Sequence, residues 1–100
     1  MRVIARSALV HFYTTHRQGA EAREPLTAWY DEVRRATWAA PADVKAQYRS
    51  ASILKGGRVV FNIAGNKFRL VVAIHYNTGI VFIRFVGTHA AYDAIDAHTV

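Results

Sequence analysis

The stretch Arg58–Val86, RVVFNIAGNKFRLVVAIHYNTGIVFIRFV, decides the fold, because its apolar side chains recur with a period of two. This alternation is typical of half-buried strands, and it predicts three of them, at Arg58–Ile63, Lys67–Tyr76 and Gly79–Val86. The connections between them are short and contain Gly65, Asn66, Asn77 and Gly79, residue types that tolerate the positive φ of tight turns. We therefore expect a consecutive antiparallel meander, with Asn66 acting as a turn residue.

On either side of the predicted meander, the sequence indicates helices. Leu26, Trp29, Tyr30 and Val33 form one apolar stripe, which indicates an amphipathic helix. The expected elements are a strand at Arg2–Ala5, a first helix capped by Ser7, a second at about Ala20–Trp38 (or from near Glu24, because of Pro25), a third from Pro41 to near Tyr48, and a last one at Ala90–Ala97 capped by Thr88. The order predicts an α+β fold, with N-terminal helices packed on one face of a small antiparallel β-sheet.

Composition narrows the class of protein. A chain of 100 residues, 52% hydrophobic and 20% charged, fits a single globular domain spanning residues 1–100. The absence of cysteine excludes disulfides, thiolate metal sites and a cysteine nucleophile. No apolar run is long enough to span a bilayer, and the N-terminus does not read as a signal peptide. We expect a cytoplasmic protein without membrane contact.

The charge is basic and uneven. Thirteen Lys and Arg against seven Asp and Glu give a net charge of +6. Between Val44 and Tyr92 the chain carries several basic side chains and no acidic one. Such a field attracts polyanions, of which nucleic acid is the usual one, although a basic surface can also serve only to keep a domain solvated.

Several polar motifs in the C-terminal half resemble those of one protein family. They are Phe61-Asn62-Ile63, Gly65-Asn66-Lys67-Phe68-Arg69-Leu70, Ile83-Arg84-Phe85-Val86-Gly87-Thr88-His89 and Tyr92-Asp93-Ala94-Ile95-Asp96. In this order they resemble HigB-type toxins of bacterial toxin–antitoxin pairs, relatives of the RelE group. Ala64 departs from the pattern, because glycine is frequent at that place.

The resemblance implies a RelE-like fold and a toxin that cleaves mRNA as it is translated on the ribosome, acting as a metal-independent endoribonuclease with no cofactor. It also implies a cognate antitoxin, HigA-like, that carries a DNA-binding helix-turn-helix.

Metal-free RNA cleavage needs cations at the phosphate and a group that transfers protons. Arg69 and Arg84 are the expected catalytic cations, because each interrupts an otherwise apolar strand and arginine donates two hydrogen bonds to phosphate. They lie on consecutive strands, so one sheet face could bring both to a single phosphate. Each arginine could instead lie on a solvated face or pair with Asp93 or Asp96.

His89 and Tyr92 complete the predicted catalytic set. His89 follows the third strand of the meander, and an imidazole side chain suits proton transfer; its alternative role is to help cap the last helix. Tyr92 lies one turn further on, where it could stack on a base or donate its hydroxyl. It could equally be a core residue with a satisfied hydroxyl.

Four further residues are expected to bind RNA. Lys55 and Arg58 flank a Gly-Gly pair and could hold the RNA backbone, as could Lys67 beside the first turn, although each could be an ordinary surface cation. His75 shares a strand face with Arg69 and could assist, although a histidine at a strand end is usually structural. His11 and His16 lack acidic or cysteine neighbours at ligand spacing, and although a site of His89, Asp93 and His98 can be drawn, no metal is expected.

Two other functions stay open on the sequence. The chain could be a module of the same fold that binds RNA or the ribosome without cutting and so blocks translation. It could also be a protein-interaction domain whose charge only solvates it.

Overall fold

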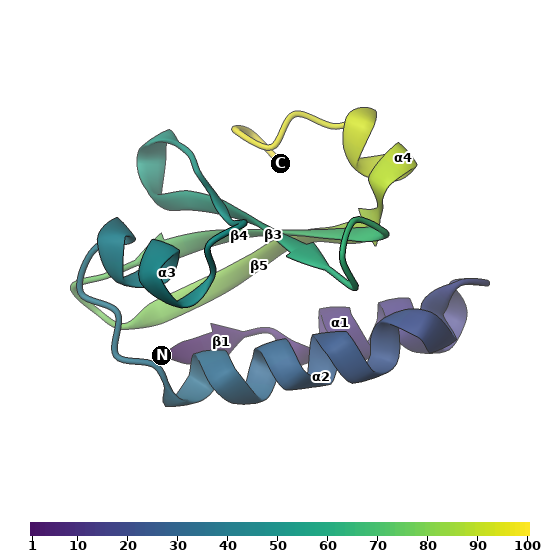
Figure 1. The fold of residues 1–100 in the computed structure, drawn as a ribbon, viewed down its shortest axis with the longest axis horizontal. Coiled ribbons are helices and arrows are strands. Elements are labelled where there is room, and N and C mark those ends of the chain that lie inside the picture. The colour runs from purple at the N-terminus through teal and green to yellow at the C-terminus, as the bar shows by residue number, and fades with distance from the viewer.

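Five strands form one sheet in the computed structural model, which describes residues 1–100 (Figure 1). Their order across the sheet is β1-β5-β4-β3-β2, with bounds β1 (Arg2–Ile4), β2 (Ser52–Ile53), β3 (Arg58–Ile63), β4 (Phe68–His75) and β5 (Ile80–Thr88). The predicted meander of β3, β4 and β5 is confirmed, and all its pairs are antiparallel. The sheet as a whole is mixed, because β1 runs parallel to β5 at the outer edge. Two parallel strands need a long connection between them, and the chain between β1 and β5 includes three of the helices as well as the other strands.

The turn between β3 and β4 takes positive φ at different residues from the one expected. Ala64 and Gly65 have φ of 55° and 67°, whereas Asn66 is not among the residues with positive φ. Two successive residues with positive φ are typical of the tight turns that match the twist of a hairpin. The turn between β4 and β5 follows the prediction, with φ of 70° at Gly79.

Four helices flank the sheet, with bounds α1 (Arg6–Thr15), α2 (Gly19–Arg35), α3 (Pro41–Gln47) and α4 (His89–Asp93). The prediction that Ser7 caps α1 is wrong, because Ala5 holds the N-cap position and Ser7 lies inside the helix. Helix α2 begins at Gly19 in spite of Pro25, because packing of its first turns, where Ala22 is fully buried, outweighs the missing backbone donor. None of the helices has the length and apolar character needed to cross a membrane.

Two predicted helix ends also differ from the structure. Helix α2 stops at Arg35 instead of Trp38, and α4 stops at Asp93 instead of Ala97. Beyond α4 the chain turns back over the sheet, where Ala97 is buried against Val60 and Val71. Burial of this apolar segment on the sheet replaces the last helical turn.

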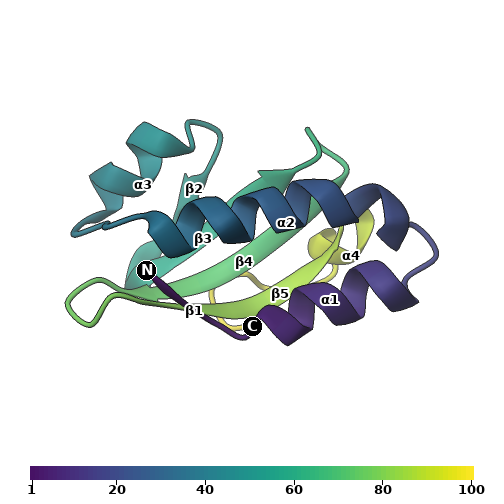
Figure 2. The ribbon, with the colours of Figure 1, turned by 90° about the horizontal axis from the view of Figure 1, so that it is seen from below.

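The main core lies between α1, α2 and one face of the sheet. Figure 2 shows the two helices side by side across the strands. The strand residues of this core are Val59, Phe61, Ile63, Phe68, Leu70, Val72, Ile74 and Val81. They are the alternating apolar positions that the sequence pattern marked, facing the predicted helix stripe of Leu26, Trp29 and Val33. Trp29 meets Phe61 edge to face, with ring centroids 5.4 Å apart.

Helix α3 is tied to this core by aromatic side chains. Trp38 stacks on Phe61, and its indole N–H donates to Gln47 over 3.0 Å. The Tyr48 hydroxyl donates to the Glu32 carboxylate. Burial, together with that carboxylate, raises the pKa of Tyr48 well above its ordinary value. Burial also raises the pKa of Tyr76, with a smaller contribution from Asp43.

Replacing Ala64 by glycine should stabilise the protein. Ala64 has positive φ, a conformation that costs a residue with a Cβ roughly 1–2 kcal/mol and costs glycine little. After allowing for the extra freedom of glycine in the unfolded chain, Ala64→Gly should raise the free energy of unfolding by about 0.5–1 kcal/mol. Urea denaturation measures the change.

The matched control is Ala28→Gly at an exposed position inside α2. It should lower the free energy of unfolding by about 1 kcal/mol. Destabilisation by both changes would contradict the assigned turn geometry.

Candidate functional site

The face of the sheet opposite α1 and α2 carries most of the residues that the sequence marks as functional. Arg58, Asn62, Arg69 and His75 alternate with the core positions of β3 and β4 and therefore lie on this face. On this side of the sheet lie α4, the segment that follows it and the short turn at Lys55–Gly57 (Figure 1). We call this surface the open face.

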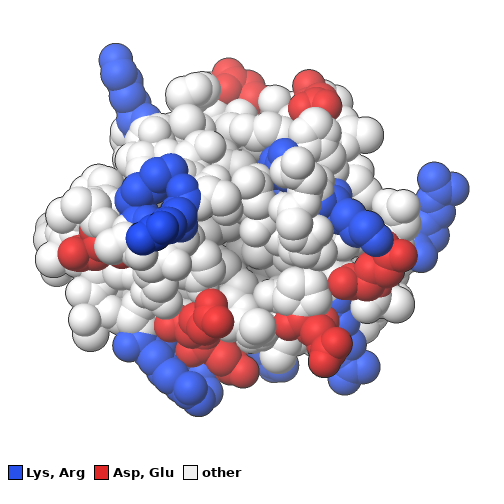
Figure 3. Space-filling view, viewed as in Figure 1, with Lys and Arg blue, Asp and Glu red and all other residues white.

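The open face is free of acidic side chains along its strands. All seven Asp and Glu residues lie outside the five strands, in α2, α3, α4 and the segment after α4. Figure 3, in the orientation of Figure 1, shows acidic side chains along the lower edge, where α2 lies. The arginines of the open face therefore create a positive field that no carboxylate on the strands neutralises.

A β-bulge separates the two arginines that were expected to converge. Val71 lies opposite Phe85, but Val72 lies opposite Ile83, so Arg84 is an extra residue without a partner on β4. Arg69 lies opposite Gly87, three residues from Arg84 along β5, or about 10 Å. In this structure the two guanidinium groups have different partners, Tyr92 and Asn66 for Arg69 and Val100 for Arg84, and the expectation that both hold a single phosphate stays a prediction.

Arg69 and Tyr92 are in contact, and we call them, together with His89 three residues before Tyr92 in α4, the Arg69 cluster. The Arg69 guanidinium lies over the Tyr92 ring, 5.9 Å from its centroid, and donates to the backbone carbonyl and side-chain oxygen of Asn66 over 3.2 and 3.3 Å. It forms no ion pair with Asp93 or Asp96, the alternative that the sequence left open. Its charge is thus held in place and available to an anion.

His89 has a carboxylate partner. Its Nδ1 lies 3.3 Å from Oδ2 of Asp93, one turn along α4, and both side chains are about half exposed. The cap of α4 is Thr88, as predicted, whose hydroxyl accepts the backbone N–H of Ala91 over 3.1 Å. The His89 ring is therefore not needed for capping. A carboxylate at Nδ1 favours the tautomer that leaves Nε2 free to accept a proton.

Tyr92 has features of both roles that the sequence left open, a packed residue and a residue that can contact RNA. Its ring is half-buried beside the small apolar cluster of Val60, Val71 and Ala97, and it also meets the Arg69 guanidinium. It therefore packs against the open face and still presents part of its surface to solvent.

The second cluster surrounds a shallow pocket of about 390 Å³, which we call the Arg58–Arg84 pocket. Its lining residues are Gly56, Arg58, Ala73, His75, Phe82 and Arg84. Arg58 and Arg84 both donate to a main-chain oxygen of Val100, the last residue, and the distance from Arg84 is 3.2 Å. The His75 and Phe82 rings meet edge to face, with centroids 5.1 Å apart.

Phe82 is the site residue that sequence reasoning missed. It lies opposite Ala73 on β4, and Ala73 lies opposite Arg58 on β3, so the three share one row of the open face. Its position two residues before Arg84 was the available signal, because the period of two puts both on one face. An aromatic residue in an apolar strand gives no other sign of a role.

Two predicted lysines lie outside both clusters. Lys67 extends toward the helical layer, where its ammonium lies 3.3 Å from a Glu21 carboxylate oxygen of α2. Its backbone carbonyl accepts the N–H of His89 over 3.1 Å and so helps to place that residue. Lys55 is exposed in a short turn of 3-10 helix before β3.

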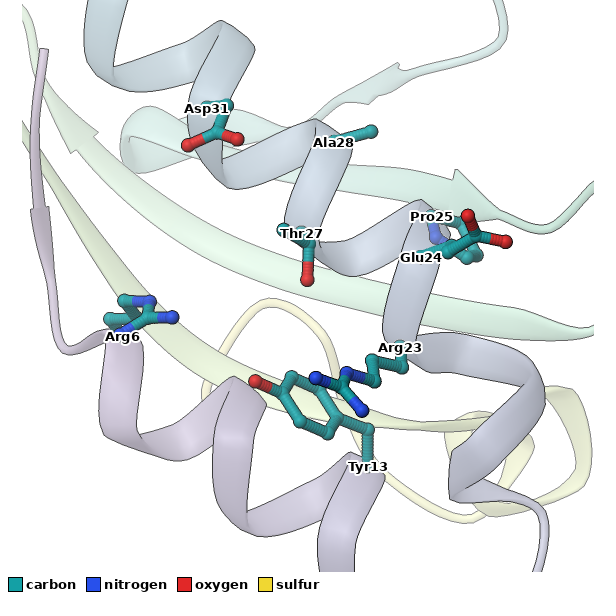
Figure 4. Close-up of a pocket in the computed structure, with 8 residues that line it drawn as sticks. All are labelled: Arg6, Tyr13, Arg23, Glu24, Pro25, Thr27, Ala28 and Asp31. Atoms are coloured by element: carbon teal, nitrogen blue, oxygen red, sulfur yellow. The ribbon is translucent and has the colours of Figure 1, made fainter.

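The largest pocket, about 610 Å³, lies elsewhere, between α1 and α2 (Figure 4). Arg23 lies over the Tyr13 ring, 5.8 Å from its centroid, and Thr27 points into the same space. Glu24 and Asp31 also line it, so its charge is mixed. It shares no residue with either cluster on the open face. No group of three or more His, Asp or Glu side chains is arranged to hold a metal ion.

Comparison with known families adds one finding. Residues 22–95 match the HigB toxin family, described as the RelE-like toxic component of a toxin–antitoxin system. The match includes the whole meander and both clusters of the open face except for Val100. A search of curated proteins finds no matching relative.

Removing the cap of α4 should loosen the Arg69 cluster. Thr88→Ala leaves the Ala91 N–H without its acceptor and should lower the free energy of unfolding by about 1 kcal/mol. Amide hydrogen exchange should accelerate first in His89–Asp93. The control is Thr27→Ala, an exposed threonine of α2 without a side-chain hydrogen bond, which should change stability by less than about 0.5 kcal/mol. Equal effects of the two changes would show that the cap does not hold α4.

Proposed function

The chain belongs to the RelE-like HigB family, the toxic components of toxin–antitoxin systems, and on this premise we propose that it cleaves RNA at the Arg69 cluster without a metal. The observation that carries the proposal is the contact of Arg69 with Tyr92 of α4, the helix on which Asp93 also holds His89, on a face without acidic strand residues. RNA contains its own nucleophile, the ribose 2′-OH, so such a site needs only to bind the phosphate and move protons.

The proposed reaction is an internal transesterification. The 2′ oxygen attacks the adjacent phosphorus, the bond from phosphorus to the 5′ oxygen breaks, and the products end in a 2′,3′-cyclic phosphate and a 5′-OH. Nε2 of His89 accepts the 2′ proton, and the imidazolium so formed gives a proton to the leaving 5′ oxygen, which returns the histidine to its initial state. Proton transfer by a positioned group typically contributes 10²–10⁴-fold to the rate.

Arg69 is the proposed phosphate ligand. Its fork can donate two hydrogen bonds to the phosphate and stabilise the charge that develops on it, a contribution comparable to that of an oxyanion-hole donor. The Tyr92 ring beneath it limits where the guanidinium can lie and offers a surface for a base. Arg84 is assigned to the neighbouring pocket instead of the catalytic set, because it lies about 10 Å along β5 from the partner of Arg69.

We further propose the setting in which this reaction occurs. The family implies an antitoxin encoded for this toxin. We propose a HigA-like, helix-turn-helix antitoxin, mRNA under translation as the substrate, the ribosome as a second partner and the cytoplasm as the location. The positive field of the open face supports a polyanionic partner of this kind.

Arg69→Ala should abolish toxicity through loss of cleavage. Primer extension on an abundant mRNA, after brief expression, should show new 5′ ends within the translated region for the wild type. The same ends should fall by about 100-fold or more for Arg69→Ala.

The matched control is Arg35→Ala, which removes the same charge from the exposed end of α2 and should cleave like the wild type. Growth arrest with an intact transcript would contradict the enzyme and favour a module that blocks translation by binding. Blocking initiation should reduce the new ends if the substrate is translated mRNA.

His89→Ala should separate cleavage from binding. The imidazole is proposed to move protons and not to hold the RNA, so the variant should cleave about 10²–10⁴-fold more slowly. Its affinity for an RNA whose 2′ oxygens are methylated, which cannot be cleaved, should stay within about two-fold of wild type. Equal loss of both activities would remove His89 from the catalytic role.

A further inference from the structure

In the Arg58–Arg84 pocket the two guanidinium groups converge on one oxygen. Neither forms an ion pair with an Asp or Glu side chain. Both donate to a main-chain oxygen of Val100, the last residue. Arginine has five N–H donors, so one acceptor oxygen leaves most of the donor capacity of the pair unused. Two guanidinium groups that meet at one oxygen form an arrangement that suits a phosphate oxygen.

The floor and wall of the pocket suit a flat ring. Ala73 lies between Arg58 and Phe82 in the row that crosses β3, β4 and β5, and its small side chain leaves room above the sheet. Phe82 is half-buried, and the exposed His75 meets it edge to face. Proteins that bind single-stranded RNA stack bases on aromatic rings of this kind. The volume of about 390 Å³ lies in the range of small-ligand pockets, roughly 300–1,000 Å³.

We propose that this pocket binds one nucleotide of single-stranded RNA, with its phosphate between Arg58 and Arg84 and its base against Phe82 and His75. The inference rests on the proposed function, since the nucleotide belongs to the strand that is cut at the Arg69 cluster. The two clusters share the open face and are separated by about 10 Å along β5, so one strand of RNA can reach both. Binding in the pocket would position the strand for cleavage.

The phosphate would replace the main-chain oxygen of Val100 at the two arginines. The segment that reaches them crosses the open face between the clusters, where Ala97 is buried against Val60 and Val71. The nucleotide and the end of this segment therefore compete for the same donors.

The test measures binding apart from cleavage. The probe is a fluorescein-labelled octanucleotide of mixed sequence with every 2′ oxygen methylated, and fluorescence anisotropy gives Kd at several salt concentrations. Phe82→Leu keeps an apolar side chain but removes the ring, and should weaken binding by about 5-fold to 100-fold. Phe82→Tyr keeps the ring and should bind like the wild type.

Arg84→Ala tests the phosphate contact. It should weaken binding and reduce the slope of log Kd against log salt by about 0.7, the contribution of one phosphate contact on a single strand. Arg35→Ala, with the same loss of charge on α2, should leave Kd and slope unchanged. Circular dichroism and thermal unfolding establish that each variant is folded.

The possible results are distinct. Wild-type binding with the losses described supports the pocket, whether or not cleavable RNA is cut, so failure of the cleavage proposal would be seen separately. A wild type that does not bind the octanucleotide, or an Arg84→Ala variant that behaves like Arg35→Ala, overturns the pocket. Equal weakening by Phe82→Leu and Phe82→Tyr overturns base stacking. If Arg69→Ala loses cleavage but the pocket variants keep the wild-type Kd, the proposed function is supported and the pocket is rejected.

Discussion

The packing of α1 and α2 against one face of the sheet is the constraint on which the rest of the structure depends. Leu26, Trp29 and Val33 fit against the alternating apolar side chains of β3 and β4, and these helix residues are at most 2% exposed. Since one face of each strand is committed to the core, every alternate residue must lie on the other face. That other face can then carry arginines in the middle of strands without any charge being buried under the helices.

The open face is divided by two features that have local causes. The bulge at Arg84 moves this residue out of register with β4; its guanidinium shares the Val100 oxygen with that of Arg58, whereas Arg69 lies over Tyr92. The segment after α4 then folds back and buries Ala97 between the two clusters. The Arg69 cluster and the Arg58–Arg84 pocket therefore lie along one surface, which is the arrangement that the proposed binding of a polyanionic strand requires.

The regular parts of this fold could be predicted from sequence, and the irregular parts could not. Strand β3 has the predicted bounds because its period of two is unbroken. Thr88 caps α4 as predicted, because a threonine directly before a helix can accept a backbone N–H of the first turn. The bulge has no signal in IVFIRFV, since one extra residue in a strand looks like ordinary alternation. For the same reason the approach of Arg84 and Arg58 to one oxygen required the register. The course of the chain after α4 depends on tertiary burial of Ala97, which a local pattern does not encode.

The central claim is that RNA binds on the open face and not in the larger pocket between α1 and α2. The most direct measurement is an NMR titration of the ¹⁵N-labelled protein with a 2′-O-methylated octanucleotide, which records the backbone amide of each residue. The account predicts that the largest shift changes fall at Arg69, Ala73 and Gly87, with Arg23 and Asp31 unaffected. Changes confined to the residues between α1 and α2, with the amides of β4 and β5 unmoved, would contradict it.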